Sequence, residues 1–163
     1  MSKIAFVGGK LVDGTGAAPV EDSLVLVDDK KIAYAGPRTE VPEGYEVRDI
    51  QGRTIMPGLI DTHLHFSGNL TDNDNDWVIE NVAQKQACAV KQSWDALSHG
   101  LTTVCEIGRN GIAIRDLVNM GIMEGPRIYA TGLGFCRVAG HGDCHQLPLE
   151  ISKDGHPWGD QVD

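Results

Sequence analysis

The sequence has no apolar run of the roughly 18 to 20 residues that a transmembrane helix requires. Its first nine residues, 1–9, include a lysine but too short an apolar stretch for a signal peptide. We therefore expect a cytoplasmic protein without a membrane partner.

Clusters of basic residues are also absent. Fourteen Lys and Arg residues stand against 23 Asp and Glu residues, which gives a formal net charge of -9. Such an acidic chain is a poor ligand for nucleic acids and for anionic membranes. We expect small molecules, not nucleic acid, as its partners.

Cysteine is scarce and is not arranged for pairing. The four cysteines, at positions 88, 105, 136 and 144, lack the CxxC spacing of structural metal sites or redox motifs. In a reducing compartment they are predicted to be free thiols. What remains is ordinary globular composition, with 41% hydrophobic and 23% charged residues, enough for one sizeable core or for a small domain plus part of another.

Residues 1–57 contain several short apolar segments separated by turn residues, with no helical period. The pattern predicts strands at 4–7, 10–12, 23–27, 32–35, 47–50 and 54–56. Short strands at this spacing are typical of a small β-sandwich or half-barrel. Pro57 and Gly58 end the region.

Residues 58–163 change to alternating strands and helices. We expect strands at 59–65, 101–107 and 127–130 and helices at 78–98 and 112–123, with a glycine- and histidine-rich loop and no further strand after Gly132. Such alternation favours parallel βαβ units and an α/β fold. The first helix has apolar residues near one side: Val78, Val82, Ala89, Val90, Trp94 and Leu97.

A closed barrel of eight such units needs about 250 residues, whereas about a hundred follow Pro57. Three strands cannot close a barrel and would leave an open edge, which favours oligomerisation or aggregation. We therefore expect the chain to be an incomplete, N-terminal portion. The alternative is that another chain supplies the remainder.

The sharpest local signal is the pair His63 and His65 at the end of an apolar strand. Residues i and i+2 of a strand project from the same face, and barrel enzymes assemble their sites at the carboxyl ends of strands. Two imidazoles suit zinc, manganese, nickel or iron, although two ligands alone bind weakly. From the pair alone, two histidines hydrogen-bonded to backbone remain a full alternative.

The surrounding residues resemble a known family. Residues 54–65, Thr-Ile-Met-Pro-Gly-Leu-Ile-Asp-Thr-His-Leu-His, resemble the first-strand signature of the amidohydrolase superfamily, PG[LF]ID-x-HxH. Gly-Leu-Thr-Thr-Val at 100–104, Gly-Pro-Arg at 125–127 and Gly-His-Gly-Asp at 140–143 are similar to the imidazolonepropionase-like branch, which includes Xaa-Pro dipeptidases. Cys105 and Glu106 depart from it, because the branch usually has Arg-Asp there; the substrate stays open.

The resemblance implies a composite β-sandwich, with residues 1–57 as its N-terminal part, beside a TIM barrel that begins at residue 58. It implies His63 and His65 as metal ligands and His141 as a substrate-binding residue. One or two ions, zinc or else manganese, nickel or iron, would activate water to hydrolyse amide or peptide bonds, as in a dipeptidase or carboxypeptidase. The other ligands and the catalytic proton carrier of the family would lie beyond Asp163, and the full-length enzyme would be a homo-oligomer.

Two other functions stay open. One is a cyclic-amide hydrolase of the imidazolonepropionase, dihydroorotase or hydantoinase kind. The other is a non-catalytic fragment that acts as a binding module.

Further polar residues have two interpretations each. Asp61 either orients the histidines or bonds to backbone, and Glu106 either faces the metal or packs structurally. A calcium loop at Asp72, Asp74 and Asp76 is disfavoured because the expected Gly and Glu are missing. A second metal cluster is a weaker hypothesis than a glycine-rich loop for the set Cys136, His141, Asp143, Cys144, His145 and His156.

Overall fold

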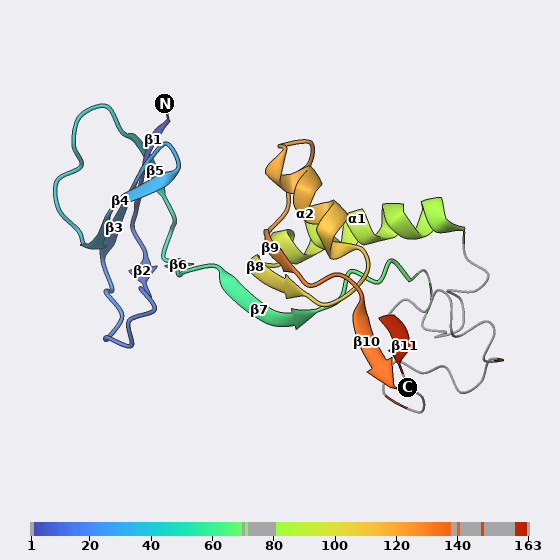
Figure 1. Ribbon diagram of the computed structural model, residues 1–163. Helices are drawn as coiled ribbons and strands as arrows, with labels where there is room; N and C mark the ends of the chain where they lie inside the picture. The colour runs from blue at the N-terminus through green and yellow to red at the C-terminus, as the bar shows by residue number, and fades with distance from the viewer. Residues whose placement is uncertain are drawn as a thin grey trace. The chain divides into compact units, whose positions relative to one another are not determined.

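The computed structural model of the chain describes residues 2–69, 71, 81–137, 140, 148 and 159–162. The chain divides into two compact units, Met1–Pro57 and Gly58–Asp163 (Figure 1). The first is built from strands alone among its described residues, and the second from strands and helices.

The first unit is organised around a four-stranded sheet of order β4-β3-β1-β5. β1 pairs antiparallel with β3 and parallel with β5, and β3 pairs antiparallel with β4. A small second sheet joins β2 to β6 in parallel. The predicted strands are all present, as β1 (Lys3–Val7), β2 (Lys10–Leu11), β3 (Ser23–Asp28), β4 (Lys31–Pro37), β5 (Glu46–Asp49) and β6 (Thr54–Ile55).

The core of this unit follows from strand alternation. Ala5 lies opposite Leu26 and Val7 lies opposite Leu24 in the β1–β3 ladder, so all four side chains project from one face. They are buried together, and Tyr34, Val41 and Tyr45 pack against them. The sheet therefore has one covered apolar face.

The second unit contains a three-stranded parallel sheet with two helices. The strands β7 (Leu59–Leu64), β8 (Leu101–Glu106) and β9 (Arg127–Ala130) lie in chain order, and each pair is parallel. Helix α1 (Val82–Ser98) connects β7 to β8, and α2 (Gly111–Asn119) connects β8 to β9 (Figure 1). The predicted βαβ alternation is confirmed.

The entry of β7 into the sheet explains why two sequence motifs occur together. The amide of Leu59 donates to the carbonyl of Gly100 at 2.8 Å. At Gly58 a Cβ atom would lie 2.1 Å from the side chain of Thr102, so only glycine permits this approach. The Pro-Gly segment before β7 is thus in direct contact with the Gly-x-Thr-Thr segment at the start of β8.

Helix α1 turns small residues, not large ones, toward the sheet. The side chain of Asn81 caps its first turn by accepting from the Ala83 amide, and Ala89, Ser93 and Ala96 are its buried residues. The prediction that Val82 and Trp94 share the packed side is wrong, because they are 73% and 52% exposed. Small residues permit a closer approach of helix to sheet than the apolar pattern suggested.

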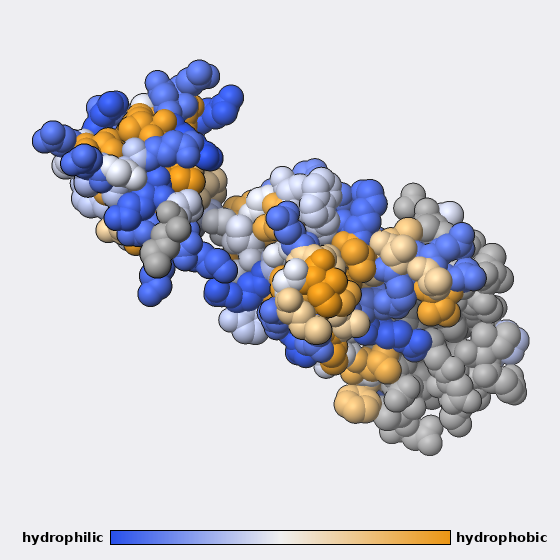
Figure 2. All heavy atoms as spheres, turned by 90° about the horizontal axis from the view of Figure 1, so that it is seen from above, coloured by the Kyte–Doolittle hydropathy of each residue, from blue (hydrophilic) through white to orange (hydrophobic). Residues whose placement is uncertain are grey.

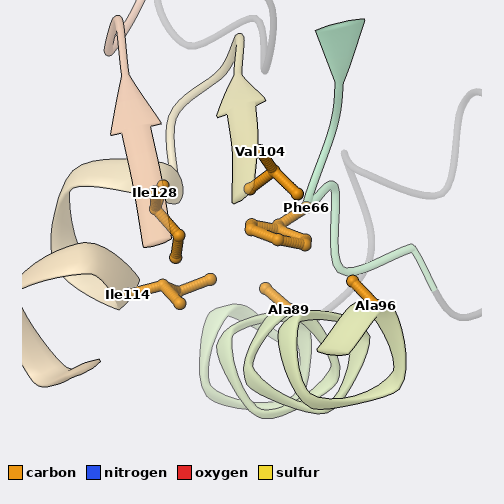
Figure 3. Close-up of a cluster of buried hydrophobic side chains, with 6 residues drawn as sticks. All are labelled: Phe66, Ala89, Ala96, Val104, Ile114 and Ile128. Atoms are coloured by element: carbon orange, nitrogen blue, oxygen red, sulfur yellow. The ribbon is translucent and has the colours of Figure 1, made fainter. Parts of the chain in front are cut away.

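The core of the second unit lies between the sheet and the helices. Val104 and Ile128 point from β8 and β9, and Phe66 from the segment after β7, onto Ala89, Ala96 and Ile114 of the two helices (Figure 3). All six side chains are buried. This layer holds the helices against one face of the sheet.

The expectation of a strandless segment after Gly132 is wrong. Residues Gly134–Arg137 form β10 and residues Gly159–Val162 form β11, and the two strands pair in parallel. Four-residue segments that contain glycine have too little alternation to identify a strand from sequence. Their pairing joins residues far apart in the chain, which local pattern does not encode.

Apolar side chains remain on the surface of both units, among hydrophilic ones (Figure 2). In the second unit Ile122 is 63% exposed and Met120 is 71% exposed. Among the helices in the described part of the chain, none combines the length and apolar character needed to cross a membrane.

Two isoleucines of the second unit provide a test of this core. Ile114→Ala should lower the free energy of unfolding by about 2–5 kcal/mol, because it leaves a cavity in the buried layer. Ile122→Ala removes the same atoms from a solvent-exposed position and should change it by less than about 0.5 kcal/mol. Equal effects of both substitutions in urea unfolding would contradict the assigned core.

Candidate metal centre

The candidate centre lies at the carboxyl end of β7. Because β7, β8 and β9 are parallel, their carboxyl ends share one edge of the sheet, the edge at which α/β enzymes bind ligands. His63 is the second-last residue of β7, and His65 directly follows the strand.

The rings of His63 and His65 are neighbours. Their centroids are 5.0 Å apart, and the ring planes are nearly perpendicular at 88°. Two imidazole nitrogens bound to one tetrahedral ion at about 2.1 Å place the ring centres roughly 5 Å apart. The pair therefore fits two positions of a divalent-metal site.

A β-bulge shapes this end of the strand. Asp61 pairs with Val104 and Leu64 pairs with Glu106, so β7 has one more residue than β8 between the two pairs. Bulges bend a strand and redirect side chains, often beside active sites. The simple alternation expected for the two histidines is thus interrupted, and His63 lies in the irregular step and is exposed.

Asp61 supports the bulge rather than a histidine ring. Its Oδ1 accepts a hydrogen bond from the backbone amide of His63 at 2.9 Å. Of the two interpretations of Asp61, the backbone role is the one observed. It stabilises the backbone turn from which the His63 ring projects.

The orientation of His65 is set by the neighbouring strand. Its Nδ1 lies 2.5 Å from the carbonyl oxygen of Ile107. A carbonyl can only accept, so Nδ1 carries the proton and the lone pair of the neutral ring is on Nε2. Metal-binding histidines commonly show this arrangement, in which one nitrogen donates to backbone and the other faces the ion.

Glu106 lies just behind the histidines and is 1% exposed. Its Oε1 accepts from the backbone amide of Phe66 at 3.2 Å. Burial raises the pKa of this carboxyl, and that effect exceeds the lowering by the Phe66 and Gly111 amides and by His65. Glu106 packs on the helix side of β8 with Val104, so the structural interpretation of this residue holds.

Several candidate residues fall outside the described residues: His141, Asp143, Cys144, His145 and His156, and also Asp72, Asp74 and Asp76. Cys136 lies in β10, where its thiol donates to the Arg137 carbonyl. Cys88 and Cys105 are free thiols, as predicted. Within the described ranges no group of three or more His, Cys, Asp or Glu residues is placed to hold a metal.

The sequence pattern did not reveal the polar contacts behind the histidines. Asn110 donates from Nδ2 to the carbonyl of Phe66 at 2.7 Å, and its Oδ1 accepts from Gln86 at 2.7 Å. The available signal was a polar residue at the start of a helix that follows a barrel strand. That signal does not specify which backbone group the side chain reaches.

Comparisons with known proteins identify relatives of this chain. Residues 54–151 match the amidohydrolase family. An ochratoxinase from Aspergillus niger is 32% identical over 147 residues, which cover 86% of this chain and 30% of the relative. Imidazolonepropionases are also among the similar proteins.

Solved structures of hydrolases share the fold. A prolidase in complex with N-methylphosphonate-L-proline has a TM-score of 0.81 at 23% identity, covering 99% of this chain and 41% of its own. A Xaa-Pro dipeptidase with bound methionine has a TM-score of 0.78 at 26% identity, covering 91% and 38%.

The chain belongs to the amidohydrolase family, and it resembles the imidazolonepropionase-like and Xaa-Pro dipeptidase-like branch within it. The structures it matches are amidohydrolase TIM-barrel proteins, and the described α/β unit corresponds to part of such a barrel. The chain spans 30% of the length of the ochratoxinase.

The raised pKa of Glu106 predicts a pH dependence of stability. Because the folded state binds the proton more tightly than the unfolded state, the contribution of Glu106 to stability falls as pH rises above 4.5, the ordinary value. Glu106→Gln does not titrate, so its unfolding free energy relative to wild type should increase over that window.

Glu46 is a control, because its pKa is shifted in the opposite direction to that of Glu106. The Arg48 guanidinium lowers the pKa of Glu46, so its contribution is lost as pH falls. Glu46→Gln should therefore become less stable relative to wild type as pH rises. Chemical denaturation from below pH 4 up to pH 8 measures both differences. If the free energy of unfolding of Glu106→Gln and of wild type changed with pH in parallel, the assigned burial of the carboxylate would be contradicted.

Proposed function

We propose that this chain is the metal-binding N-terminal part of a metal-dependent amidohydrolase that cleaves amide or peptide bonds, in the manner of a dipeptidase or carboxypeptidase. The observation that carries the proposal is the pair His63 and His65 at the carboxyl end of β7, with Nδ1 of His65 held by the Ile107 carbonyl. Family membership of residues 54–151 supports the same reaction class.

The proposed metal is zinc, as one or two ions, with manganese, nickel or iron as alternatives. A bound divalent ion would lower the pKa of a water molecule and polarise an amide carbonyl. His63 and His65 would bind it through two imidazole nitrogens. The remaining ligands and the proton carrier would come from residues outside those described.

The chain's own residues define how that ion would be held. The Ile107 carbonyl keeps the proton of His65 on Nδ1, so Nε2 keeps its lone pair without a change of tautomer. Asp61 fixes the backbone amide of His63 and with it the bulge. His63 is exposed at the edge of the sheet, so an ion and a substrate can reach it.

The proposed substrate class is a dipeptide or an N-acyl amino acid. Among the structural relatives one is a prolidase bound to an N-methylphosphonate-L-proline and one is a Xaa-Pro dipeptidase. The ochratoxinase is 32% identical to this chain over 147 residues. In this proposal His141 donates a hydrogen bond to the carbonyl or carboxylate of the substrate.

Two alternatives remain distinct from this proposal. A cyclic-amide hydrolase is favoured by the similarity to imidazolonepropionases, one of which is 50% identical over 53 residues. A binding module without catalysis is the other. Assays of the full-length protein separate the three functions. Hydrolysis of dipeptides supports the proposal, hydrolysis of cyclic amides supports the first alternative, and hydrolysis of neither supports the binding module.

Other properties of the whole protein are proposals too. We propose that the sheets of residues 1–57 are part of a composite β-sandwich. The full-length protein is proposed to be a cytoplasmic homo-oligomer that binds neither nucleic acid nor membranes.

The metal site can be tested by substitution in the full-length protein. His63→Ala and His65→Ala should each lower bound metal at least tenfold, because each removes a ligand at the proposed ion. His99→Ala is the control, since this exposed histidine ends α1 and bonds to the Asp95 carbonyl. Elemental analysis measures the metal; unchanged content in both variants would exclude the site.

The role of His141 has a separate test. His141→Asn should lower kcat/KM for a dipeptide at least tenfold, because it weakens a hydrogen bond to the substrate, while metal content stays that of the wild type. Steady-state kinetics and elemental analysis are measured on the same preparation. Wild-type kinetics would rule out substrate contact, and loss of metal would assign His141 to the metal centre instead.

A further inference from the structure

We propose that Glu106 and Asn110 are positioning residues, which together hold the two peptide groups of Phe66 and thereby fix the direction of the His65 ring. The importance of that direction for metal binding rests on the proposed function. The hydrogen bonds that hold Phe66 do not depend on the proposed function.

The two side chains bind Phe66 from both ends. Oε1 of Glu106 accepts from the Phe66 amide at 3.2 Å, and Nδ2 of Asn110 donates to the Phe66 carbonyl at 2.7 Å. Nδ2 also lies 3.4 Å from the carbonyl of Ser67. Residues just past the end of β7 are thus bound by side chains where the strand ladder no longer supplies partners.

The link to His65 is covalent. The Phe66 amide belongs to the peptide unit that joins His65 to Phe66, and this unit is planar. A hydrogen bond from it to Glu106 therefore restricts ψ of His65, while the Nδ1 bond to Ile107 restricts the ring. With backbone and ring both restrained, His65 needs little reorganisation to bind an ion.

The contacts are shielded from water. Glu106, Asn110 and Phe66 are 1%, 7% and 2% exposed. Buried hydrogen bonds are costly to lose, because water cannot replace the missing partner. The Oδ1 atom of Asn110 accepts from Gln86 of α1 at 2.7 Å, which fixes the amide with its Nδ2 toward Phe66.

The backbone around Glu106 leaves room for a carboxylate. A Cβ atom at Gly111 would lie 1.9 Å from Oε2, and one at Gly108 would lie 2.8 Å from Oε1. Two glycines therefore form the walls of the space that the carboxylate fills. An apolar residue at 106 would fill the space without an acceptor for the Phe66 amide.

The test uses the full-length protein labelled with ¹⁵N-histidine. Glu106→Ala removes the acceptor, and Asn110→Ala removes the donor. Glu106→Gln keeps an oxygen for the Phe66 amide. Val104→Ala is the matched control, because Val104 is buried on the same side of β8 but makes no hydrogen bond to Phe66.

The first readout is the ring of His65 in metal-free protein. Long-range ¹H–¹⁵N correlation spectra report its tautomer, with signals assigned by their loss in His65→Ala. Glu106→Ala and Asn110→Ala should shift or broaden the His65 signals, whereas Glu106→Gln and Val104→Ala should retain them. Unchanged signals in both alanine variants, or equal changes in Val104→Ala, would overturn the inference.

The second readout is affinity for zinc alone, measured by chelator competition. The two alanine variants should bind zinc about 10–100-fold more weakly than wild type, and Glu106→Gln should keep most of the affinity. Equal loss in Val104→Ala would reduce the effect to destabilisation and overturn the inference. If wild type binds no zinc while the His65 signals respond as expected, the proposed function fails and the positioning role stands.

Discussion

The parallel pairing of β7 with β8 is the constraint on which the second unit depends. Gly58 admits the side chain of Thr102 at the start of the pair, and the amide of Ile107 bonds to the Leu64 carbonyl at its end, at 2.9 Å. The same end of β8 supplies the carbonyl that orients His65. If this pairing shifted by one residue, both the core and the histidine pair would be lost.

Core residues and candidate site residues come from one short segment, residues 63–66. Leu64 and Phe66 belong to the apolar layer under the helices, whereas the rings of His63 and His65 are neighbours and His63 is exposed. A β-bulge lies between Asp61 and Leu64, and the hydrogen bond from the His63 amide to Asp61 stabilises this irregular step. The packing that stabilises the unit therefore also positions the two imidazoles.

Polar residues behind the site show how burial and function are joined. Glu106 carries a carboxyl group, yet it is nearly inaccessible to water and lies in the apolar layer beside Val104. A buried carboxylate costs free energy unless it has hydrogen-bond partners, and the backbone amide of Phe66 is one. The cost is understandable if the contact serves the geometry of His65, which an apolar residue at this position would not control.

Local pattern was sufficient for the strands of residues 1–57, the βαβ order after Pro57 and the His63–His65 pair, because each depends on short-range periodicity or on a compact motif. It failed for the packed face of α1, where Ala89 and Ala96 face the sheet and Trp94 does not. It also failed for the β10–β11 pair.

The contacts of Glu106 and Asn110 with Phe66 likewise came only from tertiary structure. One physical reason explains these contacts, the packed face of α1 and the β10–β11 pair. How closely a helix can approach a sheet, and which distant backbone group meets a side chain, depends on residues brought together by folding and not on their neighbours in sequence. The sequence by itself determined the family and the candidate ligands, and the tertiary structure decided how those ligands are held.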